Sequence, residues 1–180
     1  MPSQPSKQMN SLLVNLVRFA GLILLQVLIL NNIQLIGYVN PFVYVLFIMM
    51  LPLALPGWLL LLIGFLTGYT VDLFMSTNGL HAASTVLMAF ARPYVIQLAT
   101  GVKEPETVSE PGLSQMGIRW WFSFSLTLVV VHHFALFLLE SFSFSQLGYT
   151  ILRMLLSVAA SEIIILMLSY FFMMRPKKKS

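Results

Sequence analysis

Residues 64–83 read Gly64-Phe-Leu-Thr-Gly68-Tyr-Thr-Val-Asp72-Leu-Phe-Met-Ser-Thr-Asn-Gly79-Leu-His81-Ala-Ala: an apolar helix, a carboxylate near its end, a tight polar turn and a second apolar helix. Gly64, Gly68 and Asp72 are four residues apart, so they share one helix face. In lipid, a face of small residues lets a neighbouring helix approach closely. An ionisable side chain at membrane depth is costly, so we expect Asp72 to point into protein or into a wet cavity.

The composition indicates an integral membrane protein. Of the 180 residues, 58% are hydrophobic and 9% are charged, and the mean hydropathy is +0.88. A soluble domain carries about 25% charged residues, so this chain cannot cover a globular surface with polar groups. The chain has no cysteine, which excludes disulfides, thiolate metal sites and cysteine nucleophiles.

Five segments have the roughly 20 apolar residues that a membrane-spanning helix needs. A sixth candidate, from about Pro41 to Leu53, is interrupted by Pro52 and followed by Pro56. We expect residues 41–56 to be a short, kinked or partly re-entrant helix, and whether they span is left open. The predicted fold is an all-α, polytopic bundle of about six transmembrane helices, forming a single transmembrane domain over residues 1–180. The five uninterrupted segments are residues 12–30, 57–74, 80–100, 119–140 and 146–174.

The distribution of basic residues predicts the orientation. With six spans, three polar segments fall on one side: the tail at residues 1–11, the loop at residues 101–118 and the basic tail at residues 175–180. The loops near residues 31–40, 75–79 and 141–146 contain no Lys or Arg. Because cytoplasmic loops carry an excess of Lys and Arg, both termini are predicted to be cytoplasmic. Five spans would separate the two basic ends, so the charge pattern favours an even number.

Five ionisable residues lie within or at the edge of the predicted spans: Asp72, Arg92, Glu140, Arg153 and Glu162. At ~1.5 Å of rise per residue, Arg92 lies roughly 18 Å and Glu162 roughly 24 Å from the outer face, depths compatible with an ion pair. Arg153 is expected to neutralise one of the carboxylates of Asp72 and Glu140. Structural ion pairs are the favoured interpretation, because unpaired charge is costly in lipid; the alternative is a substrate or proton site.

His132 and His133 are neighbours in the fifth apolar segment. Adjacent helical residues point about 100° apart, so the two rings cannot bind one ion from one helix face. A metal site would need His81 or a carboxylate from elsewhere, and hydrogen-bonded packing histidines are favoured. No phosphate-binding loop and no Ser/His/Asp set at a readable spacing is present, so we expect no catalytic residue, metal or cofactor.

The run from Gly64 to Ala82 resembles the central motif of the MreD family of bacterial rod shape-determining proteins, through Gly64, Gly68, Asp72 and Gly79. The resemblance implies a non-enzymatic subunit of the elongation machinery in the bacterial inner membrane, which supports lateral peptidoglycan synthesis and rod cell shape. It implies MreC as a partner, RodA and an elongation transpeptidase directly or through MreC, MreB indirectly, and no nucleic acid. It also implies a fold similar to the S component of energy-coupling-factor transporters.

Within this reading, the Gly64/Gly68 face either packs internally or receives the single span of a partner, and Asp72 fixes the turn. One alternative function is an S-component-like protein that captures a vitamin-like small molecule. It predicts a polar pocket on the outer side, lined by Phe142, Phe144 and Tyr149. Another alternative is an intramembrane enzyme or proton-coupled carrier that uses the buried carboxylates, for which no nucleophile or metal set can be named.

Overall fold

The computed structural model describes residues 5–32, 39–100, 110–141 and 147–173, with side chains described from residue 12 to residue 171 of these ranges. Every regular element in the described ranges is helical. Two helices are short, α2 (Leu46–Met50) and α5 (Leu113–Met116). The long helices are α1 (Pro5–Leu24), which continues as a π-helical turn η1 (Leu25–Leu30), α3 (Gly57–Met75), α4 (Leu80–Thr100), α6 (Ile118–Glu140) and α7 (Leu147–Met173).

Five of these helices are long and apolar enough to cross a membrane. Their bounds fall within a few residues of the five uninterrupted segments in the sequence, because apolar length alone defines such a helix. The structure therefore confirms an all-helical, multi-pass membrane bundle. The five spans are Leu12–Leu30, Gly57–Met75, Leu80–Thr100, Ile118–Glu140 and Leu147–Phe171.

Residues 41–56 contain a short helix, one of the forms predicted for them, and not a sixth long one. This segment contains only α2, whose five residues cover ~7.5 Å, far less than the ~30 Å hydrocarbon core. Leu51 has extended backbone angles, and Pro52 follows it, so the helix cannot continue. Residues 42–51 are nevertheless all buried, none more than 7% exposed, and form the centre of the core.

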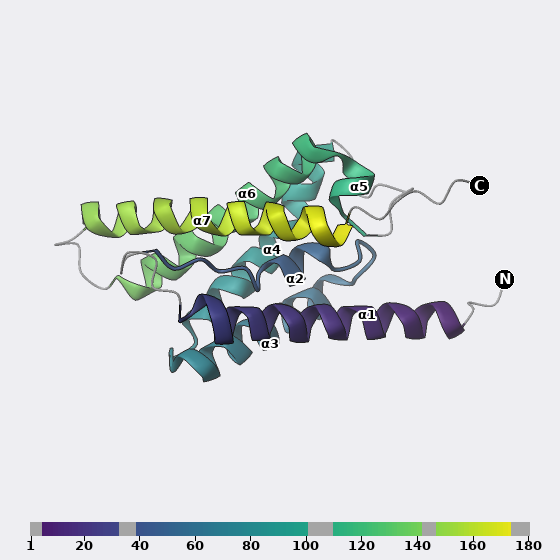
Figure 1. Cartoon of the computed structure of the whole chain (residues 1–180), viewed down its shortest axis with the longest axis horizontal. Coiled ribbons are helices and arrows are strands. Elements are labelled where there is room, and N and C mark those ends of the chain that lie inside the picture. The colour runs from purple at the N-terminus through teal and green to yellow at the C-terminus, as the bar shows by residue number, and fades with distance from the viewer. Residues whose placement is uncertain (1–4, 33–38, 101–109, 142–146, 174–180) are drawn as a thin grey trace.

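This buried segment runs through the bundle antiparallel to α1. Val43 donates its backbone N–H to Gln26 Oε1 (2.8 Å), near the end of the first span. Four residues later, Phe47 packs its ring against Phe19, which is seven residues, or about two turns, before Gln26, with ring centroids 5.3 Å apart. Figure 1 shows α2 between α1 and α7, with the Pro5 end of α1 and the Met173 end of α7 at the same end of the bundle.

Side chains of α7 satisfy the non-helical backbone of this segment. Asn40 donates its N–H to Ser157 Oγ (3.0 Å), and Phe42 donates to Ser161 Oγ (2.8 Å). Four residues of helix rise ~6 Å, which matches the ~6.6 Å covered by two residues of extended chain. Two serines spaced by one turn can therefore serve alternate N–H groups, as backbone buried at membrane depth requires.

Gln26 serves the same segment from the other side. Its Nε2 donates to the carbonyl of Pro41 (3.0 Å) and to Asn31 Oδ1 (2.8 Å), while its Oε1 accepts from Val43. Gln26 is only 1% exposed, so all of its amide groups are used inside the protein. Around this segment, α3 packs on α4, α4 on α6, and α6 on α7.

Candidate functional site

The glycine face of α3 is in direct contact with the first turns of α4. A Cβ added at Gly68 would lie 2.6 Å from Ala82 Cα, and one added at Gly64 would lie 3.0 Å from Ala89 Cβ. Only the absence of a side chain permits this approach, as expected for small residues at a helix–helix contact in lipid. Of the two alternatives, internal packing is the one the structure has, so this face is not open to a partner's span.

Asp72, near the end of α3, caps the N-terminus of α4. Its Oδ2 accepts the backbone N–H of Ala82 (2.9 Å), and its Oδ1 accepts that of His81 (3.1 Å). These N–H groups are in the first turn of α4, where no preceding carbonyl is available to them. Gly79, just before the helix at φ +85°, has no side chain to act as a cap. Asp72 therefore does from the neighbouring helix what an N-cap residue does locally.

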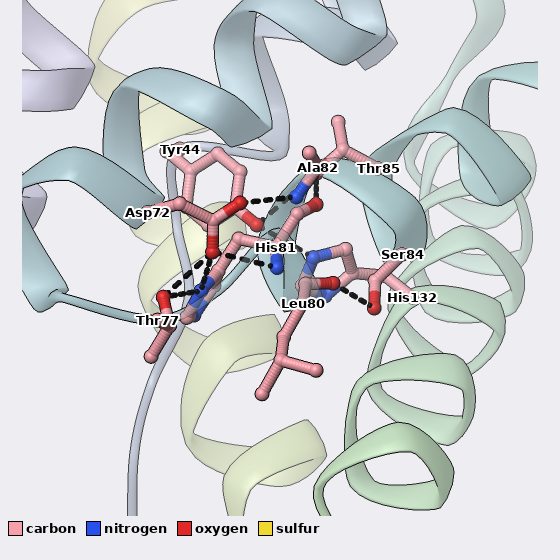
Figure 2. Close-up of polar contacts among 9 residues, drawn as sticks. All are labelled: Tyr44, Asp72, Thr77, Leu80, His81, Ala82, Ser84, Thr85 and His132. Atoms are coloured by element: carbon pink, nitrogen blue, oxygen red, sulfur yellow. Dashed lines mark hydrogen bonds and ion pairs between the residues drawn. The ribbon is translucent and has the colours of Figure 1, made fainter.

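Two side chains complete the environment of this carboxylate. Thr77 donates its hydroxyl to Asp72 Oδ1 (2.6 Å), and His81 Nδ1 lies 2.9 Å from Thr77 Oγ1 and 3.1 Å from Asp72 Oδ1. Because the Thr77 proton goes to the carboxylate, the hydrogen bonds assign a proton to His81 Nδ1. Asp72 is 4% exposed and accepts from four donors. We call Asp72, Thr77, His81 and Ala82 the Asp72 cluster (Figure 2).

The Asp72 cluster is hydrogen-bonded to the buried segment through Tyr44. Thr85 donates to the carbonyl of His81 (2.7 Å), and Tyr44 Oη lies 3.1 Å from Thr85 Oγ1 and 2.7 Å from His132 Nε2. Since the Thr85 proton is already used, Tyr44 donates to Thr85 and accepts from His132. Figure 2 shows this chain from His132 to the first turn of α4.

His133 makes a separate set of hydrogen bonds. Its Nδ1 donates to the carbonyl of Val129 (2.9 Å), and its Nε2 accepts the hydroxyl of Ser161 (3.0 Å), which itself accepts from Phe42. The two adjacent histidines thus have different hydrogen-bond partners, which agrees with the prediction of packing histidines. Among the residues that the structure describes, no three His, Asp or Glu side chains are grouped to hold a metal ion.

All the residues that carry the resemblance to MreD therefore meet at one joint between α3 and α4. Gly64 and Gly68 bring the helices together, Gly79 makes the turn, and Asp72 caps the second helix. No protein-family model, curated protein or solved structure matches this chain.

The structure brings Arg153 and Glu140 together where the C-terminal end of α6 meets the N-terminal part of α7. Arg153 Nη2 lies 3.8 Å from Glu140 Oε1, and the Glu140 side chain is 47% exposed. The guanidinium also lies over the rings of Phe137 and Tyr149, at 5.4 and 5.8 Å from the ring centroids. Of the two carboxylates named for Arg153, it pairs with Glu140, because the Asp72 carboxylate is enclosed in its own cluster.

The predicted pair between Arg92 and Glu162 is wrong. Arg92 instead donates to the backbone carbonyls of Leu51 and, at 3.5 Å, Met49, where it satisfies the C-terminal end of α2. Glu162 Oε1 accepts the hydroxyl of Ser125 at 2.6 Å. The two residues have similar depths, but α6 packs against both α4 and α7 and so separates them.

Several residues that build this interior were missed in the sequence, among them Gln26, Tyr44, Thr77, Thr85, Ser157 and Ser161. A signal for some was present. Polar side chains within apolar segments tend to face the bundle interior. A pair of serines one turn apart on α7 therefore indicates a helix face that makes buried hydrogen bonds. No signal in the sequence identifies the partners of the two serines, which lie more than 100 residues earlier in the chain.

Proposed function

We propose that this chain is a non-enzymatic membrane subunit of the rod elongation machinery, of the MreD type. The observation that carries the proposal is that Gly64, Gly68, Asp72 and Gly79 all contribute to one interhelical joint. All four residues act inside the protein, where they fix how α3 and α4 pack against each other. A motif of this kind suits a protein that acts through the helix faces it presents to partners.

The outward faces of α3 and α4 are the surfaces that the joint orients. Phe65 and Tyr69 on α3 stack with ring centroids 5.7 Å apart, and Phe90 and Tyr94 on α4 lie 5.4 Å apart, all at least 45% exposed. In this proposal the single span of MreC docks against such lipid-facing surfaces. RodA and the elongation transpeptidase associate directly or through MreC, MreB associates indirectly, and the outcome is lateral peptidoglycan synthesis and rod shape.

The proposal places the chain in the bacterial inner membrane with both termini cytoplasmic. Its support is the basic character of residues 1–11, 101–118 and 175–180. Much of these segments, including the Lys7 side chain, lies outside the described residues. The helix ends to which they connect at Pro5 and Met173 are at one end of the bundle (Figure 1).

The S-component alternative draws less support from the described residues. Phe142 and Phe144, two of the three predicted pocket residues, lie outside them. Tyr149 is 44% exposed and lies beside Arg153. A cavity of the structure is lined almost entirely by apolar side chains, mostly from the first span, rather than by polar groups on the outer side.

Affinity purification of the tagged protein from native membranes in mild detergent, followed by mass spectrometry, tests the proposal. Recovery of MreC with the wall-synthesis enzymes is the expected result. Recovery of a transporter's ATPase subunits, or of a stoichiometric small molecule, would overturn it and favour the S-component function. Gly68→Leu serves as the disrupted bait, because its side chain collides with α4, and Gly148→Leu is the matched control, because nothing lies within 4 Å of a Cβ there.

A further inference from the structure

A lateral groove lies between the first span, α2 and Leu168 of α7. It has a volume of about 630 Å³ and is lined by α1 and η1 from Leu13 to Leu25, by Leu46 and Met50 of α2, and by Leu168 of α7. This volume lies within the range of about 300 to 1,000 Å³ typical of ligand sites. Among the described residues that line it, Arg18 alone carries a charge.

The groove is elongated along α1. Leu13 and Leu25 are twelve residues apart, so it follows the helix for ~18 Å. Apolar walls over this length can take an extended hydrocarbon chain.

The groove also has the depth of one lipid leaflet. Counted from Leu12, where the first span begins, Arg18 is ~9 Å inside and Leu25 ~20 Å inside, beyond the midpoint of a ~30 Å hydrocarbon core. An arginine at the first depth can extend its guanidinium to the headgroup level. The Arg18 guanidinium can therefore reach the interface, and the Leu25 end of the groove is near the bilayer centre.

The Arg18 guanidinium has donors to spare. In the part of the chain that the structure describes, both of its hydrogen bonds come from Nη1, to Asn15 Oδ1 (3.2 Å) and Glu110 Oε2 (2.9 Å). Its side chain is 24% exposed, and among the described residues Nε and Nη2 have no protein acceptor. A guanidinium edge of this kind is suited to two parallel hydrogen bonds with a phosphate.

We propose that the groove holds an acyl chain of a phospholipid from the leaflet at the Pro5 end of α1, with the lipid phosphate on Arg18. The apolar walls bind the chain, and Arg18 selects a head group that carries phosphate. Glu110 competes with the phosphate for the same guanidinium, so it weakens this site. The inference is independent of the elongation-machinery proposal, since it depends only on the groove and its one cation.

Photo-cross-linking in native membranes identifies the occupant. A benzophenone amino acid at Val17, which lines the groove and is 65% exposed, is compared with one at Leu16, which is 64% exposed and does not line it. The proposal expects a phospholipid adduct that is enriched at Val17 over Leu16. Cross-linking of Val17 to a protein, to a second copy of the chain, or to lipid at the same yield as Leu16 would overturn it.

Native mass spectrometry of the purified protein, titrated with phosphatidylglycerol in detergent, tests the chemistry. The wild type is expected to retain one phospholipid, Gly21→Trp to lose it by filling the groove, and Gly148→Trp to keep it, since both glycines have open space at Cβ. Arg18→Gln is expected to reduce retention relative to the exposed Arg119→Gln. Glu110→Gln is expected to increase it, a gain that damage to the fold cannot produce. Equal retention by wild type and Gly21→Trp, or no gain with Glu110→Gln, would refute the site.

Discussion

Replacing Asp72 by asparagine tests whether the carboxylate stabilises the joint between α3 and α4. The asparagine oxygen can take the place of Oδ1 and keep the hydrogen bonds from Thr77 and His81. Its NH₂ group then occupies the position of Oδ2, where it faces the N–H of Ala82 instead of accepting it. The variant loses one hydrogen bond to a charged acceptor and the negative charge at the start of α4.

The expected loss of stability follows from these two changes. A hydrogen bond to a charged group contributes about 1.5–3 kcal/mol, and a charge at a helix N-terminus contributes about 0.3–1 kcal/mol, or more when partly buried. Asp72→Asn should therefore lower the free energy of unfolding by about 2–4 kcal/mol. For a chain of this size, that corresponds to a fall in Tm of roughly 4–16 °C.

Thermal unfolding of the purified protein in mild detergent measures this change. Glu140→Gln is the matched control, because it also converts a carboxylate to an amide but at a side chain that is 47% exposed. Its ion pair with Arg153 is exposed and long, so its loss should cost less than about 1 kcal/mol. If Asp72→Asn unfolded at the same temperature as Glu140→Gln, the capping role argued for Asp72 would be refuted.

Three further substitutions test the packing and the buried segment by the same thermal assay. Gly68→Ala places a Cβ against the α4 backbone and should destabilise by about 1–3 kcal/mol, whereas Gly148→Ala, in open space, should stabilise by about 0.4–1 kcal/mol; equal effects would contradict the close contact. Gln26→Leu leaves two backbone groups of the buried segment without partners and should cost about 1–3 kcal/mol for each, so an unchanged Tm would show that other groups satisfy them. Arg92→Met removes the donors to the end of α2 and should destabilise by a similar amount, an expectation that fails if the methionine variant is as stable as the wild type.

The sequence predicted the five long helices closely because the hydrophobic length of a span is a local property of the chain. It predicted that Asp72 would be enclosed because the cost of a bare charge in lipid does not depend on the fold. The capping of α4 by Asp72 was predicted only as a role in the turn. The N–H groups of His81 and Ala82 donate to Asp72 because Gly68 allows α3 to approach the start of α4 closely.

The wrong Arg92–Glu162 pair has a physical origin, which is that position along a span gives depth and says nothing about direction within the membrane plane. Arg92 and Glu162 match in depth, but α6 stands between their helices. Residues 41–56 were expected to form a short, kinked or partly re-entrant helix because Pro52 and Pro56 interrupt them, and α2 is a short helix. The hydrogen-bond partners of this segment are on helices that precede and follow it by many residues, as with Gln26 and Ser161.

The charge pattern predicts an even number of crossings, and the described residues hold five helices long and apolar enough to cross a membrane. Figure 1 draws the N-terminal end of α1 and the C-terminal end of α7 toward the same end of the bundle. A sixth passage by residues 39–56, mostly without helix, would reconcile the two and stays a prediction. Lipid would leave their backbone groups unpaired, so this passage has to lie in the interior, where Gln26, Ser157, Ser161 and Arg92 supply the missing hydrogen bonds. These four side chains therefore stabilise the buried segment, because without them its backbone groups would lie unpaired in the interior of the bundle.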